Sequence, residues 1–344
     1  MHSLIILALS CLIIFIISIY LGLLFKGIDR KGAAYYQSRI GPPLRQPYWD
    51  LKKLMMKQTI IPENSVPWIF KGAPLLSFAS SVVLLIYIIL PYFMHLAGLN
   101  HSFIKSGDLI LIVYLLMIPA IAMVAGGFAS GSPYASVGAQ REMVILMSTE
   151  LPIAVIVVTF AWKMAKAAPE AASFNLATIT SNPLWNGMGP LGIMGGIILV
   201  LVMIAVVPAE LAKIPFDQGE AETEIAEGLL AEYSGKYFAF FYLSEAVKVL
   251  AITSLMVILF FPHGVAELFG ARLILGGIDF TIAADVVLFL FKHIIIYFFT
   301  VTTIRIAMAR LKITQVAQLF LLILTVTSLM GFLLIYLDPV ISKI

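Results

Sequence analysis

The sequence lacks most of what a redox enzyme or a metalloprotein needs. Cys11 is the only cysteine among 344 residues, so the chain alone forms no disulfide and holds no iron–sulfur cluster. The five histidines are scattered, and only His293 lies deep in an apolar run, which disfavours a bis-histidine haem. No phosphate loop, nucleophile elbow or metal-ligand spacing occurs. We therefore expect the chain to bind no cofactor and no metal of its own.

Charge is scarce as well. Asp, Glu, Lys and Arg make up 12% of the chain, and the net charge is +3. The basic residues lie in loops and not along a helix or an arm that follows phosphates, so nucleic-acid binding is not supported. Hydrophobic residues reach 61%, and the mean hydropathy is +1.02. Soluble globular proteins do not have this composition, so the chain is predicted to lie in a bilayer.

Long apolar runs predict an all-α integral membrane protein that forms a single polytopic domain over residues 1–344. A helix needs about 20 apolar residues to cross a membrane, and eight runs are long enough. They cover residues 1–25, 75–96, 108–128, 141–162, 191–207, 237–261, 283–304 and 313–337. A cleaved signal peptide is disfavoured because no basic residue precedes the first run. Eight spans place both termini on the same side of the membrane.

The segment 26–71, after the first span, holds nine of the 22 Lys and Arg residues. Within it, the run 49–57 is amphipathic at helical spacing. Apolar residues fall on one side and charged residues on the other (Leu51, Leu54 and Met55 against Asp50, Lys53 and Lys57). We expect this run to form a helix in the plane of the membrane surface.

The stretch Pro208–Ser234 gathers acidic residues between two apolar runs. With Lys213 as the nearest counter-charge, it carries Glu210, Asp217, Glu220, Glu222, Glu224, Glu227 and Glu232. Crowding and partial burial raise the pKa of carboxylates. Read as a helix, Glu220, Glu224 and Glu227 share one face at i, i+4 and i+7. A solvated acidic loop is the alternative, and the charge pattern alone does not separate the two.

The distribution of basic residues predicts the orientation. Fifteen of the 22 Lys and Arg residues fall in the loops after spans 1, 3, 5 and 7. Five fall in the opposite loops and at the C-terminus, and Lys248 and Lys292 lie within spans. By the positive-inside rule, segments 26–71 and 208–236 are cytoplasmic and both termini are outside. We expect a multi-pass protein of the cell membrane.

Ionisable groups inside spans are costly, so they usually pair or line a wet path. Glu245 and Lys248 lie at i, i+3 in the sixth span. Asp285 and Lys292 lie at i, i+7 in the seventh, so each set presents on one helical face. Together with Glu150 and the pair Glu210 and Lys213, these residues are candidates for a string of titratable sites. A structural salt bridge is the simpler interpretation of either pair alone.

The segment from Glu210 to Glu224 then carries a resemblance. Its sequence is Glu-Leu-Ala-Lys-Ile-Pro-Phe-Asp-Gln-Gly-Glu-Ala-Glu-Thr-Glu, followed by Glu227-Gly228 and by Glu-Tyr-Ser-Gly at 232–235. It resembles the signature loop of the quinone-site membrane subunit of the NADH–quinone oxidoreductase (complex I) family, with Lys213 where that family usually has Arg. The eight spans and the large loop after the first one agree, so the resemblance covers essentially the whole chain.

A second motif points to one branch of the family. Complex I members carry Arg-x-Gly-Pro-Asn and, about seven residues later, Gln-Pro and an Asp-x-x-Lys-Leu helix. This chain reads Arg39-Ile-Gly-Pro-Pro-Leu-Arg-Gln46-Pro-Tyr-Trp-Asp50-Leu-Lys-Lys53-Leu, with the intervening stretch nearly absent. The shortened form is similar to the membrane anchor of the group 4, energy-converting NiFe hydrogenases, including formate hydrogenlyase and the archaeal membrane-bound hydrogenases.

The resemblance implies a subunit that docks a hydrophilic redox module and helps couple its electron transfer to H⁺ or Na⁺ translocation, without being the catalyst itself. Implied partners are hydrogenase-like large and small subunits and antiporter-like membrane subunits. A NiFe or related centre and iron–sulfur clusters would lie in those partners. The implied ion-path and coupling residues are Glu150, Glu210, Lys213, Asp217, Glu220, Glu222, Glu224, Glu227, Glu245, Lys248, Asp285 and Lys292. The implied docking residues are Arg39, Arg45, Gln46, Trp49, Asp50 and Lys53.

Three alternatives stay open at this point. A quinone-site subunit of a complex I-type enzyme predicts quinone-dependent activity, and the missing stretch near Pro43 counts against it. A subunit of a sulfane-sulfur reductase complex is similar to the same anchor, and the sequence does not separate it from the hydrogenase branch. A stand-alone secondary transporter is favoured by the intramembrane charges and disfavoured by the absence of recognisable repeats.

Overall fold

The computed structural model describes residues 2–96, 108–167, 174–269, 274–275 and 278–341. Its helices are α1 (His2–Tyr36), α2 (Gln46–Met56), α3 (Pro67–Leu96), α4 (Leu109–Ala129), α5 (Pro133–Ala167), α6 (Leu176–Ser181), α7 (Pro190–Glu210), α8 (Glu222–Ile225), α9 (Gly235–Phe260), α10 (Val265–Phe269), α11 (Thr281–Tyr297), α12 (Thr303–Ala307), α13 (Ile313–Gln318) and α14 (Thr325–Ile341). The two-residue strands β1 (Ile274–Leu275) and β2 (Ile278–Asp279) pair antiparallel. The predicted loop 163–188 lies partly outside the described residues, and α6 forms within its described part.

The predicted all-α membrane fold is confirmed, because eight helical segments among the described residues are long and apolar enough to span a bilayer. Several boundaries were predicted too short. α1 continues to Tyr36 where the first span was expected to end at residue 25, and α5 begins at Pro133 instead of residue 141. The reason is that charged residues near these ends are buried in contacts within the protein, Lys26, Asp29 and Glu142 among them. The helices therefore do not end at the first charged residue.

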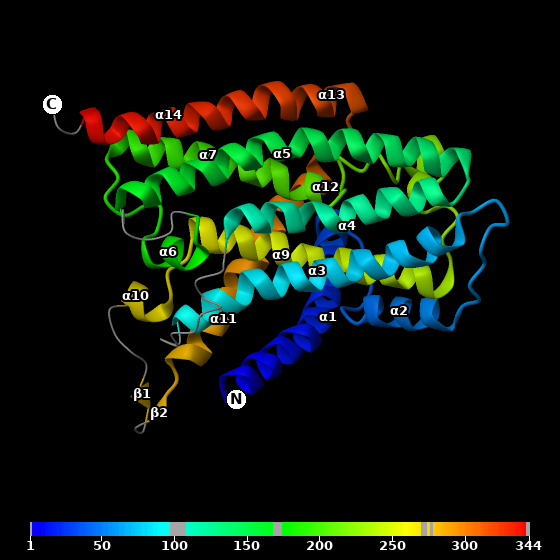
Figure 1. The fold of residues 1–344 in the computed structure, drawn as a ribbon, viewed down its shortest axis with the longest axis horizontal. Coiled ribbons are helices and arrows are strands. Elements are labelled where there is room, and N and C mark those ends of the chain that lie inside the picture. Colours follow the sequence, from blue (N-terminus) through cyan, green and yellow to red (C-terminus); the bar gives the residue numbers. More distant parts are fainter. Residues whose placement is uncertain (1, 97–107, 168–173, 270–273, 276–277, 342–344) are drawn as a thin grey trace.

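α9 forms the centre of the bundle. From Leu243 to Phe260 nearly all of its side chains are buried. It packs against α1, α2, α3 and α11, while α14 packs against α7 and α5 on the far side of the bundle (Figure 1). Lys248, a charged residue of this stretch, is consequently buried among protein side chains.

The last two spans are not uninterrupted α-helices. α11 passes into α12 through a π-helical turn at Phe298–Thr302, and α13 passes into α14 through another at Leu319–Leu324. In both, a threonine hydroxyl donates to the carbonyl five residues earlier: Thr303 to Phe298 at 3.0 Å and Thr325 to Phe320 at 2.7 Å. Each of these carbonyls also accepts the backbone N–H of the same threonine, so the hydroxyl adds a second donor at the wider turn.

The two loops predicted on one side of the membrane do lie together. α2 packs against α1 and α9, and the Ile60 N–H donates to the Ser234 hydroxyl at 3.0 Å. Figure 1 shows α2 and the loop after it at one end of the bundle, with α6, α10 and the C-terminus at the other end. The end that carries α2 is called the loop end below.

Candidate functional site

The acidic loop is pressed onto α5, and this contact determines its shape. A Cβ atom on Gly138 of α5 would lie 2.6 Å from the Gly219 oxygen, and Leu229 N–H donates to that same oxygen at 3.1 Å. The interpretation of Glu220, Glu224 and Glu227 as one face of a helix is wrong. Glu220 precedes the four-residue α8, and Glu227 has a left-handed backbone with φ of 65°. Only Glu220 of these three turns toward the bundle interior.

A cavity of about 100 Å³ lies between this loop and the bundle. Four carboxylates, Glu142, Glu210, Glu220 and Glu245, line it together with Lys248 and Ser244. A buried water needs only about 10–15 Å³ of such space and two or more polar partners, so the cavity is large enough for several waters. Phe238, Phe241 and Met123 complete the walls. The cavity therefore has charged groups on part of its wall and apolar side chains on the rest.

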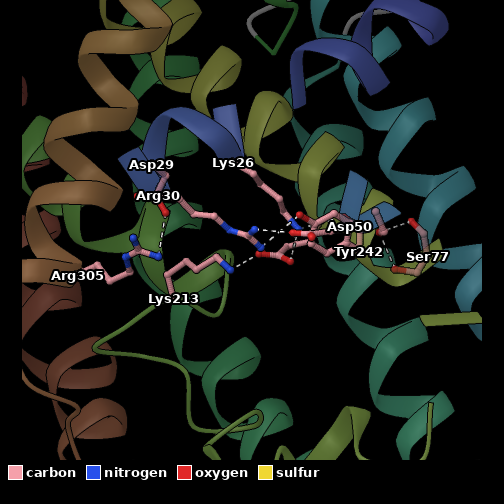
Figure 2. Close-up of polar contacts among 10 residues, drawn as sticks. Lys26, Asp29, Arg30, Asp50, Ser77, Lys213, Tyr242 and Arg305 are labelled. Carbon is pink, nitrogen blue, oxygen red and sulfur yellow. Dashed lines mark hydrogen bonds and ion pairs between the residues drawn. The ribbon is translucent and has the colours of Figure 1, made fainter. Parts of the chain in front are cut away.

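Glu245 is held between two cations from other parts of the chain. Lys26 of α1 binds its Oε2 at 2.6 Å, and Lys213 of the acidic loop binds its Oε1. Lys26 also donates to the Tyr242 carbonyl at 3.1 Å and lies over the Tyr242 ring. Figure 2 shows Lys26 and Lys213 extending from different segments of the chain. Burial works against the charge of Lys213, yet the neighbouring Glu245 and Glu220 leave its pKa raised.

Glu210 and Lys248 form the second buried pair. Lys248 Nζ lies 3.2 Å from Glu210 Oε2, and the Thr149 hydroxyl donates to Glu210 Oε1 at 2.7 Å. The pairs expected between sequence neighbours, Glu210 with Lys213 and Glu245 with Lys248, do not form. Lys213 binds Glu245 instead, and Lys248 binds Glu210. Each ion pair joins two segments of the fold, so the cavity is closed by contacts between elements and not within one helix.

Two carboxylates at the site keep an unpaired oxygen. Oε2 of Glu142 and Oε1 of Glu150 are buried and receive no hydrogen bond from the described part of the protein. Glu142 is 4% exposed and lines the cavity, whereas Glu150 is half-buried on the same helix. A buried carboxylate oxygen without a protein donor needs water or a proton. Glu142 is therefore a candidate for holding a water or a proton at the cavity, and sequence reasoning had missed it.

Burial raises the pKa of Glu220 to about 7, with the Glu245 carboxylate adding to the rise and Lys213 and Lys26 opposing it. This side chain lies in the loop outside the spans and lines the cavity from above. A carboxyl group with a pKa near neutrality exchanges its proton at physiological pH. Glu220 thus lies between the cavity and the acidic loop, and its carboxyl group gains or loses a proton near pH 7.

Two further ion pairs join α1 to the neighbouring helices α2 and α12. Arg30 of α1 binds Asp50 of α2 at 2.6 Å, and Arg305 of α12 binds Asp29 of α1 at 2.9 Å (Figure 2). The hydrogen bonds from Arg30 and Gln46 leave the pKa of Asp50 lowered, although burial opposes this. α1 therefore carries Lys26, Asp29 and Arg30 within about one turn, and these residues form ion pairs with α9, α12 and α2 respectively.

The acidic loop is clamped from outside by two arginines. Arg310 binds both oxygens of Asp217 at 2.8 and 2.5 Å, and Arg141 binds Glu224 at 2.5 Å. A bidentate pair of this kind fixes orientation as well as charge. Sequence reasoning missed Lys26, Asp29, Arg30, Arg141, Arg305 and Arg310. Their clustering at the ends of spans on one side was the available signal, and it had been used only to predict orientation.

The geometry agrees with comparisons to known proteins. The NADH dehydrogenase family matches residues 8–336. The chain belongs to this family. It is 31% identical to hydrogenase-4 component C of Escherichia coli (strain K12) over 79% of this chain and 81% of that protein. It is 33% identical to formate hydrogenlyase subunit 4 of the same organism, over 72% and 76% of the two chains.

A solved structure of the membrane-bound sulfane sulfur reductase, described as an archaeal respiratory membrane complex, contains a chain with the same fold. The TM-score is 0.77 with 25% sequence identity, and the match covers 96% of this chain and 99% of the other. The predicted resemblance to the group that unites complex I membrane subunits and hydrogenase anchors is thereby confirmed at the level of the family.

Within this NADH dehydrogenase family fold, the remaining predicted residues separate into groups. Glu222 and Glu227 are exposed on the acidic loop. Asp285 and Lys292 lie beside the far end of α9: Asp285 accepts from Val265 N–H at 2.6 Å, and Lys292 donates to the His263 carbonyl at 2.6 Å. No charged residue lies between Lys248 and Phe260 on α9. These two residues are thus separate from the cavity and do not extend its string of charges.

The predicted docking residues also differ among themselves. Arg39, Arg45, Trp49 and Lys53 are exposed at the loop end, and Trp49 is 51% exposed. Asp50 was placed on the polar side of the amphipathic helix, but it faces Arg30, and Gln46 donates to it at 2.9 Å. α2 therefore presents basic and aromatic side chains outward and a carboxylate inward. Within the described residues, no three His, Cys, Asp or Glu side chains are grouped to hold a metal ion.

Proposed function

We propose that this chain is the membrane subunit that anchors a hydrophilic, NiFe-hydrogenase-like redox module and couples its electron transfer to H⁺ or Na⁺ translocation. The names of its relatives, components of hydrogenase-4 and formate hydrogenlyase, support the assignment. The proposed partners are hydrogenase-like large and small subunits and antiporter-like membrane subunits. Those partners would carry the NiFe or related centre and the iron–sulfur clusters.

One observation carries the proposal: a cavity with four carboxylates lies directly under the acidic loop and is linked to α2 through the ion pairs of Lys26 and Arg30 on α1. A redox event in a module seated on the loop end changes the local charge. Glu220, with a pKa near 7, responds by gaining or losing a proton. The proton then passes by way of cavity water to Glu142 or to the Glu210–Lys248 pair. Such transfer becomes coupling only if the loop or the proton distribution has two states that the redox event biases.

The proposal is tested by a substitution at the cavity that keeps the size and shape of the side chain. Glu142→Gln removes the unpaired, protonatable oxygen and preserves the size of the side chain. We expect the amount of assembled complex to stay near that of the wild type. Ion translocation per electron pair, measured in vesicles, is expected to fall severalfold.

Glu63→Gln is the control, because Glu63 is exposed in the loop after α2 and lies outside the cavity lining. Surface charge changes usually alter stability by less than about 0.5 kcal/mol. Normal translocation in the Glu142 variant would remove this residue from the path. Normal translocation in variants of Glu142, Glu210 and Glu220 together would remove the function proposed for the cavity.

The orientation is part of the same proposal, with the loop end in the cytoplasm and both termini outside. Single cysteines at Glu63 and Lys236, two exposed positions, in a Cys11→Ser background are expected to react with a membrane-impermeant thiol reagent only in inside-out vesicles. The measurement is labelling in intact cells against inverted vesicles, with permeabilised cells as the control. Labelling of either cysteine in intact cells would reverse the orientation.

The sulfane-sulfur reductase alternative has its own support in the fold match over 96% of the chain. Both alternatives place this chain in the same structural role and differ in the module above it. Identification of the metals and subunits that purify with the chain separates them. Nickel in the complex supports the hydrogenase assignment, and a nickel-free complex that reduces sulfane sulfur supports the other.

A further inference from the structure

A second cavity, much larger and of opposite character, lies among α1, α3, α9 and α11. Its volume is about 780 Å³. The walls are formed mainly by branched and aromatic side chains, with Ile13 and Ile17 of α1, Leu85 and Phe93 of α3, and Phe289 of α11 among them. None of the described residues that line it is Asp, Glu, Lys or Arg. This cavity is called the apolar groove below.

The apolar groove opens sideways, toward the bilayer. All its lining residues lie within predicted spans, and side chains on two of its walls are exposed. Ile16 of α1 is 59% exposed, and Ile282 of α11 is 50% exposed. In Figure 1 the N-terminal half of α1 slants away from the rest of the bundle. The medium that reaches the groove is therefore hydrocarbon and not water.

Three polar side chains in the groove, Ser18, Ser254 and His293, have hydrogen-bond partners within the chain. Ser18 donates to the Phe15 carbonyl at 2.7 Å, and Ser254 lies 2.6 Å from the Leu250 carbonyl. His293 holds the Phe289 carbonyl at 2.9 Å with Nδ1 and the Ser254 hydroxyl at 2.8 Å with Nε2. These groups require no hydrogen bond from an occupant. An occupant of the groove is accordingly apolar along its length.

The side chains that line the groove indicate whether its occupant is a flexible acyl chain or a helix of another protein. Where helices of this protein touch closely, they do so at glycine: a Cβ atom on Gly22 would lie 2.5 Å from the Ala246 oxygen, and one on Gly195 would lie 2.6 Å from the Gly331 oxygen. Small residues of this kind let helix backbones approach in membranes. Neither glycine nor alanine is among the described residues that line the groove, and its walls are bulky. Such a surface fits a thin chain that bends around Ile and Phe side chains.

We propose that the apolar groove binds an acyl chain of a membrane phospholipid. Left empty, its lining would lose the dispersion contacts that neighbouring atoms supply. The chain fills the space between α1 and α11 and supports the outer half of α1, whose membrane-facing side chains have few protein neighbours. The headgroup lies outside the groove, since none of the described lining residues is Lys or Arg. The binding site is separate from the charged cavity and does not depend on the function proposed for it.

A photoreactive lipid tests this directly. The complete complex is reconstituted in phosphatidylethanolamine–phosphatidylglycerol vesicles that contain phosphatidylcholine with a diazirine in one acyl chain. It is then exchanged into detergent and irradiated, and the labelled peptides are mapped by mass spectrometry. Label is expected to remain on residues 13–21 and 286–290. It is expected to be lost from the exposed apolar face of α14 and the turn before it, at Leu322, Val326 and Met330. Equal loss at both places would overturn the proposal.

The second part of the experiment uses a variant in which a larger side chain fills the groove. Ile17→Trp places an indole in the space, and the retained label is expected to fall severalfold. Ile197→Trp is the matched control, because Ile197 is similarly exposed on α7 but lies outside the groove. If Ile17→Trp fails to assemble, competition on the wild-type complex decides instead. Displacement by unlabelled phosphatidylglycerol supports the proposal. Displacement by an isoprenoid quinone alone, or a cross-link from the groove to a helix of another subunit, refutes it.

Discussion

Cells that carry Glu245→Leu are expected to contain severalfold less assembled complex than the wild type. Glu245 neutralises both Lys26 and Lys213, so its removal leaves two largely buried cations facing each other without a shared carboxylate. Breaking a buried ion pair costs about 3–5 kcal/mol. The Glu245 side chain is 30% exposed toward the cavity, so the lower end, about 3 kcal/mol, is the expected cost. The measurement is the quantity of complex in purified membranes and its thermal unfolding in detergent.

A double-mutant cycle checks the cause. Lys26→Met alone leaves Glu245 paired with Lys213 and is expected to be the milder change. Lys26→Met combined with Glu245→Leu removes one of the stranded cations and is expected to recover part of the loss. Coupling energies between contacting residues are about 0.5–3 kcal/mol. Full stability of Glu245→Leu, or no coupling in the cycle, would show that the ion pairs of Lys26 and Lys213 do not hold the site together.

The eight spans could be predicted because the bilayer imposes its thickness on the sequence. Long apolar runs have few other uses, and the structure places a helix at each of them. The sequence also predicted that the segment around α2 and the acidic loop lie at the same end of the bundle, because most Lys and Arg residues fall in the loops on one side. These features depend on local composition and not on partners far away in the chain.

The partners of the buried charges could not be predicted in this way. Glu245 has Lys248 three residues away on the same helix, yet it binds Lys26, which is 219 positions away in the sequence. Helix packing decides which charges face one another, and a one-dimensional pattern does not contain that information. Glu142 was missed because the apolar run that follows it places it at the start of a span. α5 begins nine residues earlier, so Glu142 lies well inside the bundle.

The acidic loop shows why periodicity misled. Glu220, Glu224 and Glu227 have helical spacing, but Gly219 and Gly228 press against Gly138, and the backbone turns left-handed at Ala226 and Glu227. Close backbone contact outweighs helix propensity over such a short segment. The three glutamates consequently face different surroundings: cavity, Arg141 and solvent. Only the first is in a position to link the loop to the cavity.

α1 connects α2 to the cavity. Its half at the loop end carries Lys26, which binds Glu245, and Arg30, which binds Asp50 of α2. One turn separates the two residues, so a displacement of α2 acts on the same helix that holds the cavity carboxylate. A partner subunit seated on Trp49 and Lys53 would thus be mechanically linked to Glu245. Contiguity of this kind allows coupling, and a measured second state is needed to demonstrate it.

The pH dependence of Glu220 gives the most specific test of the site. Its pKa is raised by burial from an ordinary value near 4.5 to about 7, so the folded protein binds more protons than the unfolded chain between these values. Stability from this group is full at low pH and declines as the pH rises through 7. Glu220→Gln cannot titrate. The thermal unfolding temperature of the variant complex is expected to depend less on pH between about 5 and 8 than that of the wild type.

The same variant separates stability from transport. In the wild type, ion translocation per electron pair is expected to change with pH around 7, because Glu220 gains or loses its proton there. Glu220→Gln is expected to lower translocation severalfold and to abolish this transition while assembly stays near normal. Glu232→Gln, in the same loop but outside the cavity lining, is the matched control and should keep the wild-type profile. An unchanged profile in Glu220→Gln would leave Glu142 and the Glu210–Lys248 pair as the remaining candidates for the proton path.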